Sequence, residues 1–249
     1  MAEILKDAGN FEILTPLEWL PFQLQIIERA GRTCYQSVKG PITPKTAKRF
    51  ARKILRKGHG GVLEHSLMTV QFNLTSRGMT HEQVRHRLTA VCQESTRYVD
   101  ESNLQFVMPP HRDSEELIQL RNEDSELAEL LPEWMTPETM AAVYELFYRS
   151  LLRSGWKPED ARQFLPIGTK SQIVVSANFR EWLHIFKMRT SRFAHWEIRR
   201  IMGLLLEEVQ PLLTPIFDGF ELDGEDKHGL RQWKQVSRTK KKKKRHGSA

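Results

Sequence analysis

Apolar and polar side chains alternate over Met68–Leu74, and a period of two is typical of a half-buried strand. Before this strand, apolar residues recur at helical spacing over 47–55. That helix is expected to begin with Thr43 as its N-cap and Pro44 at its first position, and to end at the glycine pair starting at Gly60. Helices mixed with few strands predict an α+β fold, in which a small sheet is packed by several helices.

The same patterns predict further elements and no internal repeat. In chain order these are an exposed helix over 114–131; a helix from Thr136-Pro137 to Gly155, with Met140, Val143, Tyr144, Phe147 and Leu151 on its inner face; a short helix from Pro158 to Leu165; a buried strand at 173–175; a helix that Asn178 caps, with Glu181 at its third position; and a helix from about Ala194 to Val209, before Pro211.

The net charge of +7 is concentrated at one end of the sequence. Seven basic residues lie within 238–245, and without them the 38 Lys and Arg fall to 31, which equals the 31 Asp and Glu. We therefore predict one folded domain over 1–223 and a charged, flexible basic tail over 224–249. The lysine run could bind nucleic acid or acidic lipid through phosphates, or could be solvated without a partner. It lacks the interleaved aromatic residues of a single-strand groove.

The chain is expected to be cytoplasmic. Charged residues interrupt every candidate membrane span, and the first residues have no apolar stretch typical of a secretory signal. With 39% hydrophobic residues the chain can bury a core, so the two cysteines, Cys34 and Cys92, are not needed as a disulfide.

The densest polar stretch comprises 82–87 and 93–98. Thr80 is a plausible cap for a helix that carries the first part. Successive helical residues point about 100° apart, so Arg85, His86 and Arg87 cannot all grip one small group. They suit a site shared between two anions or between two subunits. The second part adds hydroxyls, backbone N–H groups and a guanidinium, which are good phosphate donors. A solvated basic helix followed by a capping loop explains the composition equally well.

Arg85-His86-Arg87, followed after seven residues by Ser95, resembles the signature of flavin-dependent thymidylate synthases. Other stretches fall in the order of that family over roughly residues 25 to 220. They are Glu64-His65, Asn178-Phe179-Arg180-Glu181-Trp182, Arg189, and Ala194-His195-Trp196-Glu197-Ile198-Arg199.

The resemblance implies the conversion of deoxyuridylate (dUMP) to thymidylate (dTMP), with FAD as redox cofactor, NADPH as reductant and 5,10-methylenetetrahydrofolate as carbon donor. It implies a homotetramer whose sites lie between subunits. Arg189 would be catalytic, polarising the uracil ring without any enzyme nucleophile. The residues that would bind dUMP are Glu82, Gln83, Val84, Arg85, Glu94, Ser95, Thr96, Arg97, Gln172 and Arg189. Those that would bind FAD are His59, Gly61, Glu64, Arg85, His86, Arg87, Glu94, Asn178, Phe179, Arg180 and His184.

Three positions depart from the family pattern. Gln172 replaces an arginine that in several relatives reaches the nucleotide, a contact that Lys170 could supply instead. Gly61 replaces a hydroxyl near the flavin, so only its backbone could contact the flavin there. His184 stands where some members have Asn, and either side chain can hydrogen-bond a flavin ring.

Other readings of single residues compete with these assignments. Cys92 could be a thiolate nucleophile, although a buried small residue fits its neighbours better. Ser95 has no nucleophile elbow and no obvious base, so phosphate binding fits it better. The spacing of the histidines matches no common set of metal ligands, so no metal is predicted. Two rival functions stay open: a nucleic-acid-binding protein, suggested by the tail and the basic triplet, and a nucleotide or flavin sensor without turnover, suggested by Gln172.

Overall fold

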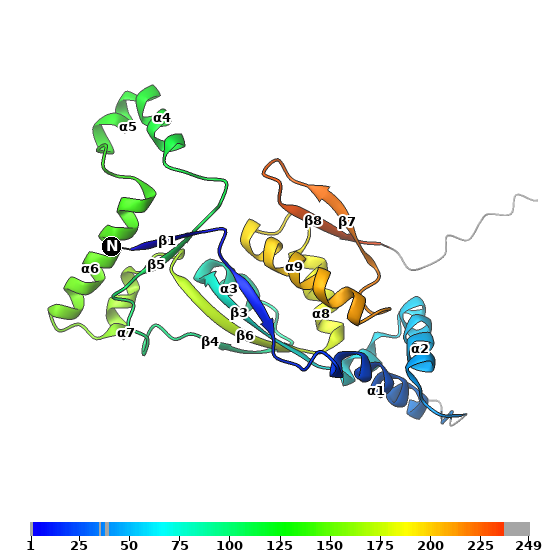
Figure 1. The fold of residues 1–249 in the computed structure, drawn as a ribbon. Helices are drawn as coiled ribbons and strands as arrows, with labels where there is room; N and C mark the ends of the chain where they lie inside the picture. The colour runs from blue at the N-terminus through cyan, green and yellow to red at the C-terminus, as the bar shows by residue number, and fades with distance from the viewer. Residues whose placement is uncertain (1, 35, 38–39, 237–249) are drawn as a thin grey trace, which may run out of the picture. The chain divides into compact units, whose positions relative to one another are not determined.

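The computed structural model describes residues 2–34, 36–37 and 40–236, and the lysine run lies outside them. The chain forms two compact units. The first comprises Met1–Glu12, Val70–Val175 and His195–Ile201; the second comprises Ile13–Thr69, Ser176–Ala194 and the residues from Met202 onward. Small sheets and helices alternate along the chain, so the prediction of a mixed fold with a small sheet packed by helices is confirmed (Figure 1).

A four-stranded sheet with the order β2-β3-β6-β4 supplies most of the strands of the first unit. Its central strand β3 has Met68, Val70 and Phe72 fully buried, which confirms the alternating strand. A separate pair joins β1 and β5 in parallel. The strand bounds are β1 Glu3–Lys6, β2 Asn10–Ile13, β3 Met68–Ser76, β4 Thr89–Gln93, β5 Gln105–Met108 and β6 Lys170–Ala177.

Helices α4 to α6 of the first unit depart from prediction in two places. The expected helix over 114–131 is interrupted at Asp124, whose backbone is extended. The inner face of α6 is wrong, because Val143 and Phe147 are 39% and 45% exposed while Glu145 is buried with an ion pair to Arg149. The bounds are α3 Arg77–Gln83, α4 Glu115–Glu123, α5 Ser125–Leu130, α6 Pro137–Arg153, α7 Pro158–Ala161 and the 3₁₀ turn η2 Arg162–Phe164.

The second unit contains a helix that the sequence patterns did not reveal, α1. Its buried residues include Leu20, Leu24 and Ile27, which have helical spacing, but Pro21 in the first turn obscures the start. Thr43 caps α2 as predicted, although Gly58 ends it earlier than expected. The bounds are α1 Trp19–Cys34, α2 Pro44–Lys57, the 3₁₀ turn η1 Gly60–His65, and α8 Phe179–Arg189; α9 spans Trp196–Leu212 and so runs from the first unit into the second.

The core of the second unit is aromatic. Trp182 is fully buried and donates a hydrogen bond from Nε1 to the Met68 carbonyl at 3.0 Å, so it is a packing residue. Phe186 packs edge-to-face against Phe217. The last helix continues through Pro211 instead of ending at Val209.

Strands β7 (Phe220–Glu225) and β8 (Arg231–Gln235) form an antiparallel hairpin in the second unit. The prediction that residues beyond Gly224 form a flexible extension is therefore wrong as far as Gln235. These strands are mostly exposed, with one buried residue at Phe220, so they have no clear apolar alternation. Across the part of the chain that the structure describes, no helix is long and apolar enough to cross a membrane.

Candidate functional site

The basic triplet lies just beyond a short helix in the first unit. Ser76 caps α3, accepting a hydrogen bond on Oγ from the Met79 N–H at 3.0 Å. The helix ends at Gln83, so the prediction that it begins near Thr80 and carries Arg85 to Arg87 is wrong. The chain instead turns there, with the His86 N–H bonded to the Gln83 carbonyl at 3.1 Å. Arg85 and Arg87 are exposed while His86 is buried, so His86 does not share the environment of the two arginines.

Strand β4 leads from this turn to Glu94, whose carboxylate is nearly buried. Both Glu94 oxygens lie 3.1 Å from the Nζ atom of Lys170 on the neighbouring strand β6. The Glu94 N–H donates to the Gln172 carbonyl at 2.9 Å, and the Gln172 side chain is exposed. Lys170, considered above as a substitute donor for the nucleotide, thus neutralises Glu94 and is only partly available to a ligand.

Ser95, Thr96 and Arg97 form one turn after Glu94. The Ser95 carbonyl accepts from the N–H groups of Tyr98 and Val99, at 3.0 and 2.9 Å. The half-exposed Arg97 guanidinium lies 3.2 Å from Glu159. The Thr96 side chain is buried, and so is that of Gln83. The accessible donors of this turn are therefore the Ser95 hydroxyl and the Arg97 guanidinium, which is a small anion-binding set.

Next to this turn, a buried acid has a strongly shifted pKa. Burial raises the pKa of Glu101 from 4.5 to about 7; the Glu94 charge raises it further, while Lys170 and Arg77 oppose the shift. The Glu101 side chain is 6% exposed. It therefore keeps its proton up to about pH 7, well above the range of an ordinary carboxyl. Sequence reasoning missed it, because burial of a single acid in a loop has no periodic signal.

The motif around Ala194 to Arg199 contributes a second buried acid to this unit. Burial raises the pKa of Glu197, while hydrogen bonds from Ser76 oppose the shift. Burial lowers the pKa of His195; the charge of Glu82 raises it and that of Arg199 lowers it. Glu82 therefore lies close enough to His195 for its charge to affect the histidine, although the two residues are far apart in the sequence.

In the second unit, η1 and the start of α8 bring a further set of predicted residues together. The Glu64 carboxylate forms an ion pair with Arg180. Asn178 caps α8, accepting a hydrogen bond from the Glu181 N–H at 2.9 Å, as predicted. A Cβ atom on Gly60 would lie 3.4 Å from Nε of Arg180. These contacts tie the chain before β3 to the helix after β6, although more than a hundred residues separate them.

The remaining predicted residues of the second unit differ in access. His59, Gly61 and His184 are exposed, and a Cβ atom on Gly61 would meet nothing within 4 Å. Phe179 is fully buried, and its N–H donates to the Ser66 hydroxyl at 3.1 Å, so its side chain is a packing residue. Arg189 is the last residue of α8 and is half-buried.

The residues of η1 and α8 in the second unit fit the chemistry of a flavin nucleotide. The open backbone at Gly61 leaves room for a planar ring, while Arg180, Asn178 and His184 offer donors that can reach ring heteroatoms and phosphates. In the first unit, Arg85 and Arg87 add exposed cations. Cys92, by contrast, is exposed, so the expectation that it is buried is wrong. It lies on β4, an edge strand of its sheet, in which Ala90, Val91 and Cys92 are all exposed.

Comparison with known proteins identifies the family. The family model described as "Thymidylate synthase complementing protein" matches residues 17–214. The flavin-dependent thymidylate synthase of Mycobacteroides abscessus is 36% identical over 209 residues, covering 79% of each chain. That of Corynebacterium glutamicum is 36% identical over 210 residues, covering 80% of each chain.

Two solved structures share the fold. A UMP/dUMP methylase, PolB from Streptomyces cacaoi, bound with 5-Br dUMP, has a TM-score of 0.66 and 19% identity, covering 87% of this chain and 96% of its own. Thymidylate Synthase X from Helicobacter pylori, with FAD and dUMP, has a TM-score of 0.57 and 22% identity, covering 84% and 99%. At these identities the likeness establishes the fold alone, while the sequence relatives establish descent. The chain belongs to the flavin-dependent thymidylate synthase family, whose members are FAD-dependent methyltransferases.

Proposed function

We propose that this chain converts dUMP to dTMP, using FAD as redox cofactor, NADPH as reductant and 5,10-methylenetetrahydrofolate as carbon donor. Family membership supports the reaction type, and the solved neighbours whose titles name dUMP and FAD support the ligands. The observation that carries the proposal is the ordered set from Glu64 to Arg199, of which each structural unit holds a polar cluster.

The nucleotide would bind along the turn at Ser95 and the segment before β4. The Ser95 hydroxyl and the Arg97 guanidinium would hold the phosphate, because Arg97 pairs with a partly exposed acid that a phosphate can replace. The buried Gln83 and Thr96 would shape this site through their backbone. The other proposed contacts to the nucleotide are Glu82, Val84, Arg85, Glu94 and Gln172.

Arg189 would activate the uracil ring. A guanidinium held beside the ring stabilises the negative charge that develops when the pyrimidine acts as a nucleophile at C5. Its position at the end of α8 and its half-burial restrict the side chain, which is what electrostatic activation requires. No enzyme nucleophile takes part.

The residues that would hold the flavin are His59, Gly61, Glu64, Arg85, His86, Arg87, Glu94, Asn178, Arg180 and His184. Phe179 would contribute only its backbone. When bound, FAD supplies the hydride chemistry that the side chains lack. The protein residues orient the rings and neutralise the phosphates. We further propose a cytoplasmic homotetramer with sites between subunits, a proposal that rests on family membership.

Substitution of Arg189 tests this proposal. Arg189→Ala is expected to keep FAD but to lower dTMP formation by about 10²–10³, the usual effect of removing one electrostatic stabiliser. Arg189→Lys keeps the positive charge but lacks the planar guanidinium with its paired N–H donors, so it should recover only part of the rate of dTMP formation. Lys187→Ala, an exposed residue on the same helix, is the control. Normal turnover by Arg189→Ala, measured as dTMP by chromatography, would overturn the assigned role.

A further inference from the structure

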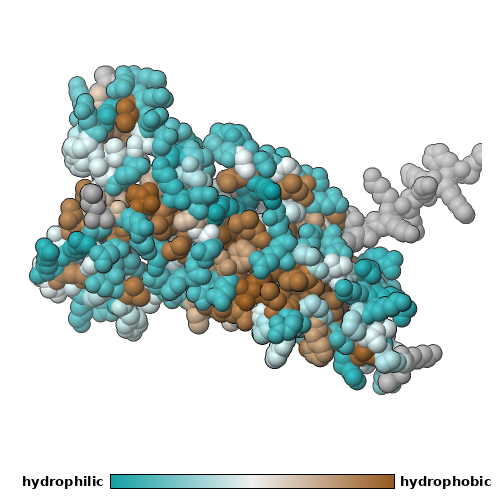
Figure 2. Space-filling model, in the orientation of Figure 1, coloured by the Kyte–Doolittle hydropathy of each residue, from teal (hydrophilic) through white to brown (hydrophobic). Residues whose placement is uncertain are grey.

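Helix α2 is strongly basic. Between Pro44 and Lys57 it carries seven Lys and Arg residues and no Asp or Glu. Figure 2 shows hydrophilic side chains covering the region of this helix. Counting the net charge outside the terminal lysine run hides this cluster, because acids elsewhere cancel it. Such a helix repels itself, so an anionic partner would stabilise it.

One stripe of α2 lines a cavity of about 550 Å³ within the second unit. Arg49, Lys53 and Lys57 follow one another at four-residue steps and so share a face of the helix. His59 continues the lining beyond the helix. Among the residues that the structure describes, no Asp or Glu forms an ion pair with these three cations. The stripe is therefore a row of uncompensated positive charge facing a hollow.

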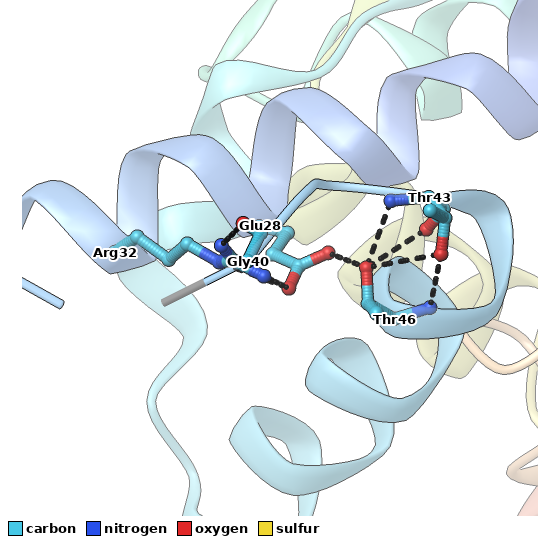
Figure 3. Close-up of polar contacts among 5 residues, drawn as sticks. All are labelled: Glu28, Arg32, Gly40, Thr43 and Thr46. Atoms are coloured by element: carbon cyan, nitrogen blue, oxygen red, sulfur yellow. Dashed lines mark hydrogen bonds and ion pairs between the residues drawn. The ribbon is translucent and has the colours of Figure 1, made fainter. Parts of the chain in front are cut away.

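Arg32, which lines this cavity, is held by a buried acid of α1, Glu28 (Figure 3). Glu28 is 4% exposed and accepts hydrogen bonds from Arg32 at 2.7 Å and from the Thr46 hydroxyl at 2.7 Å. Arg32 also donates to the Gly40 carbonyl at 2.7 Å. Although Arg32 lines the cavity, its guanidinium is thus bonded to Glu28 and the Gly40 carbonyl. The bonds join α1 to the start of α2, so the cavity is formed before a ligand arrives.

The floor of the cavity is apolar and tightly packed. Phe50 and Ile54 line the cavity as well, and Ile54 is buried. A Cβ atom on Gly31 would lie 2.1 Å from the Phe50 ring, so only glycine lets this ring lie against α1. The tip of the Phe50 ring is therefore held by packing against α1. A ligand of this cavity is therefore expected to be recognised mainly through its charge, by Arg49, Lys53 and Lys57.

We propose that this cavity binds the oligo-γ-glutamate tail of the folate co-substrate, an inference that rests on the proposed function. Four helical residues rise about 6 Å, which sets the spacing between successive cations. A γ-glutamyl unit spans five covalent bonds, or about 6 Å when extended, and bears one carboxylate. The row can thus pair with successive tail carboxylates. His59, which belongs to the proposed flavin set, places one end of the row next to the reaction.

The test compares the folate co-substrate with one glutamate against the same co-substrate with five. The holoenzyme is expected to show a KM on the order of tenfold lower for the pentaglutamate form, since each partly exposed pair contributes up to about a factor of five. Lys53→Gln/Lys57→Gln should remove most of this advantage while leaving kcat and the monoglutamate KM unchanged. The matched control is Arg52→Gln/Arg56→Gln, which removes two charges from α2 residues that do not line the cavity. It should keep the advantage.

Several outcomes would overturn the inference. Equal KM values for both forms in the unmodified enzyme would do so, as would equal losses in the two double variants, which would indicate a general charge effect. A third is loss of single-stranded oligonucleotide binding in Lys53→Gln/Lys57→Gln with the KM ratio unchanged. If the unmodified enzyme makes no dTMP from either form, the proposed function fails. Binding of labelled penta-γ-glutamate that is weakened only in the Lys53 and Lys57 variant would then still support the cavity as an oligo-γ-glutamate site. No binding of labelled penta-γ-glutamate would refute that assignment as well.

Discussion

The Glu197 carboxylate accepts two hydrogen bonds from Ser76, one from the backbone N–H at 2.6 Å and one from the hydroxyl at 2.5 Å. The same hydroxyl caps α3 by accepting from the Met79 N–H. Glu197 is 2% exposed, so these bonds form out of water. One acid thereby joins the first turn of α9 to the first turn of α3, the helix that leads into the basic triplet.

Removal of this acid should destabilise the fold. Glu197→Ala leaves a buried N–H and hydroxyl of Ser76 unsatisfied, and we expect a loss of about 2–4 kcal/mol in the free energy of unfolding. Urea denaturation of the apoprotein measures it. In a double-mutant cycle with Ser76→Ala, the coupling energy should exceed about 0.5 kcal/mol, the level above which neighbouring sites are considered coupled. Strictly additive losses would show that the two residues act independently.

Glu101 should make stability depend on pH. Burial raises its pKa from 4.5 to about 7, so the folded chain holds this proton more tightly than the unfolded chain. Its contribution to the free energy of unfolding is therefore fully present below pH 4.5 and is lost as the pH rises through about 7. The change is worth about 3 kcal/mol. Relative to the unmodified protein, Glu101→Gln should gain stability between pH 5 and pH 8 in urea unfolding. The exposed Glu129→Gln is the control, and parallel pH profiles for all three proteins would refute the assignment.

Asn178 has a structural role as a helix cap and a proposed role in flavin binding, and two substitutions separate them. Asn178→Ala should lower stability by about 1 kcal/mol through loss of the cap. Asn178→Asp keeps the oxygen that accepts from the Glu181 N–H and suits the helix N-terminus, so its melting temperature should be retained. It lacks the amide donor, so FAD binding, measured by fluorescence quenching, should weaken. Unchanged FAD affinity in Asn178→Asp would leave Asn178 as a cap only.

Cys92 tests whether the enzyme uses a nucleophile. The thiol is exposed on an edge strand, two residues before Glu94, so access alone would permit covalent chemistry. In the proposed mechanism Arg189 activates the ring, and Cys92→Ala should therefore retain kcat within about twofold, as is usual for surface substitutions. Cys34→Ala serves as the control. A large loss of kcat confined to Cys92→Ala would indicate a thiolate mechanism.

The sequence predicted elements where one residue pattern determined them. The alternation at Met68 to Leu74, the Thr43 cap and the Asn178 cap were each confirmed, because local spacing and cap chemistry decide these features. The inner face of α6 was wrong because Glu145 is buried by pairing with Arg149, which apolar periodicity cannot anticipate. The hairpin β7–β8 was missed because both of its faces are largely exposed.

The candidate site was predicted mainly by resemblance, and the structure adds the contacts between residues. Nothing in the sequence pairs Glu94 with Lys170 or Glu64 with Arg180, since each pair joins segments that only the fold brings together. The buried Glu101 and the basic cavity beside α2 were also missed. The cavity could have been anticipated from the run of seven basic residues without an acid, had charge been counted helix by helix.

The most direct test of the proposed reaction is a single turnover with reduced flavin. The purified protein is loaded with FAD, reduced anaerobically with NADPH until its visible absorption bleaches, and mixed with dUMP and 5,10-methylenetetrahydrofolate. We predict that the flavin absorption returns as about one dTMP forms per bound flavin, and that omitting dUMP prevents dTMP formation. A protein that binds no FAD, or whose reduced flavin yields no dTMP, would contradict the account.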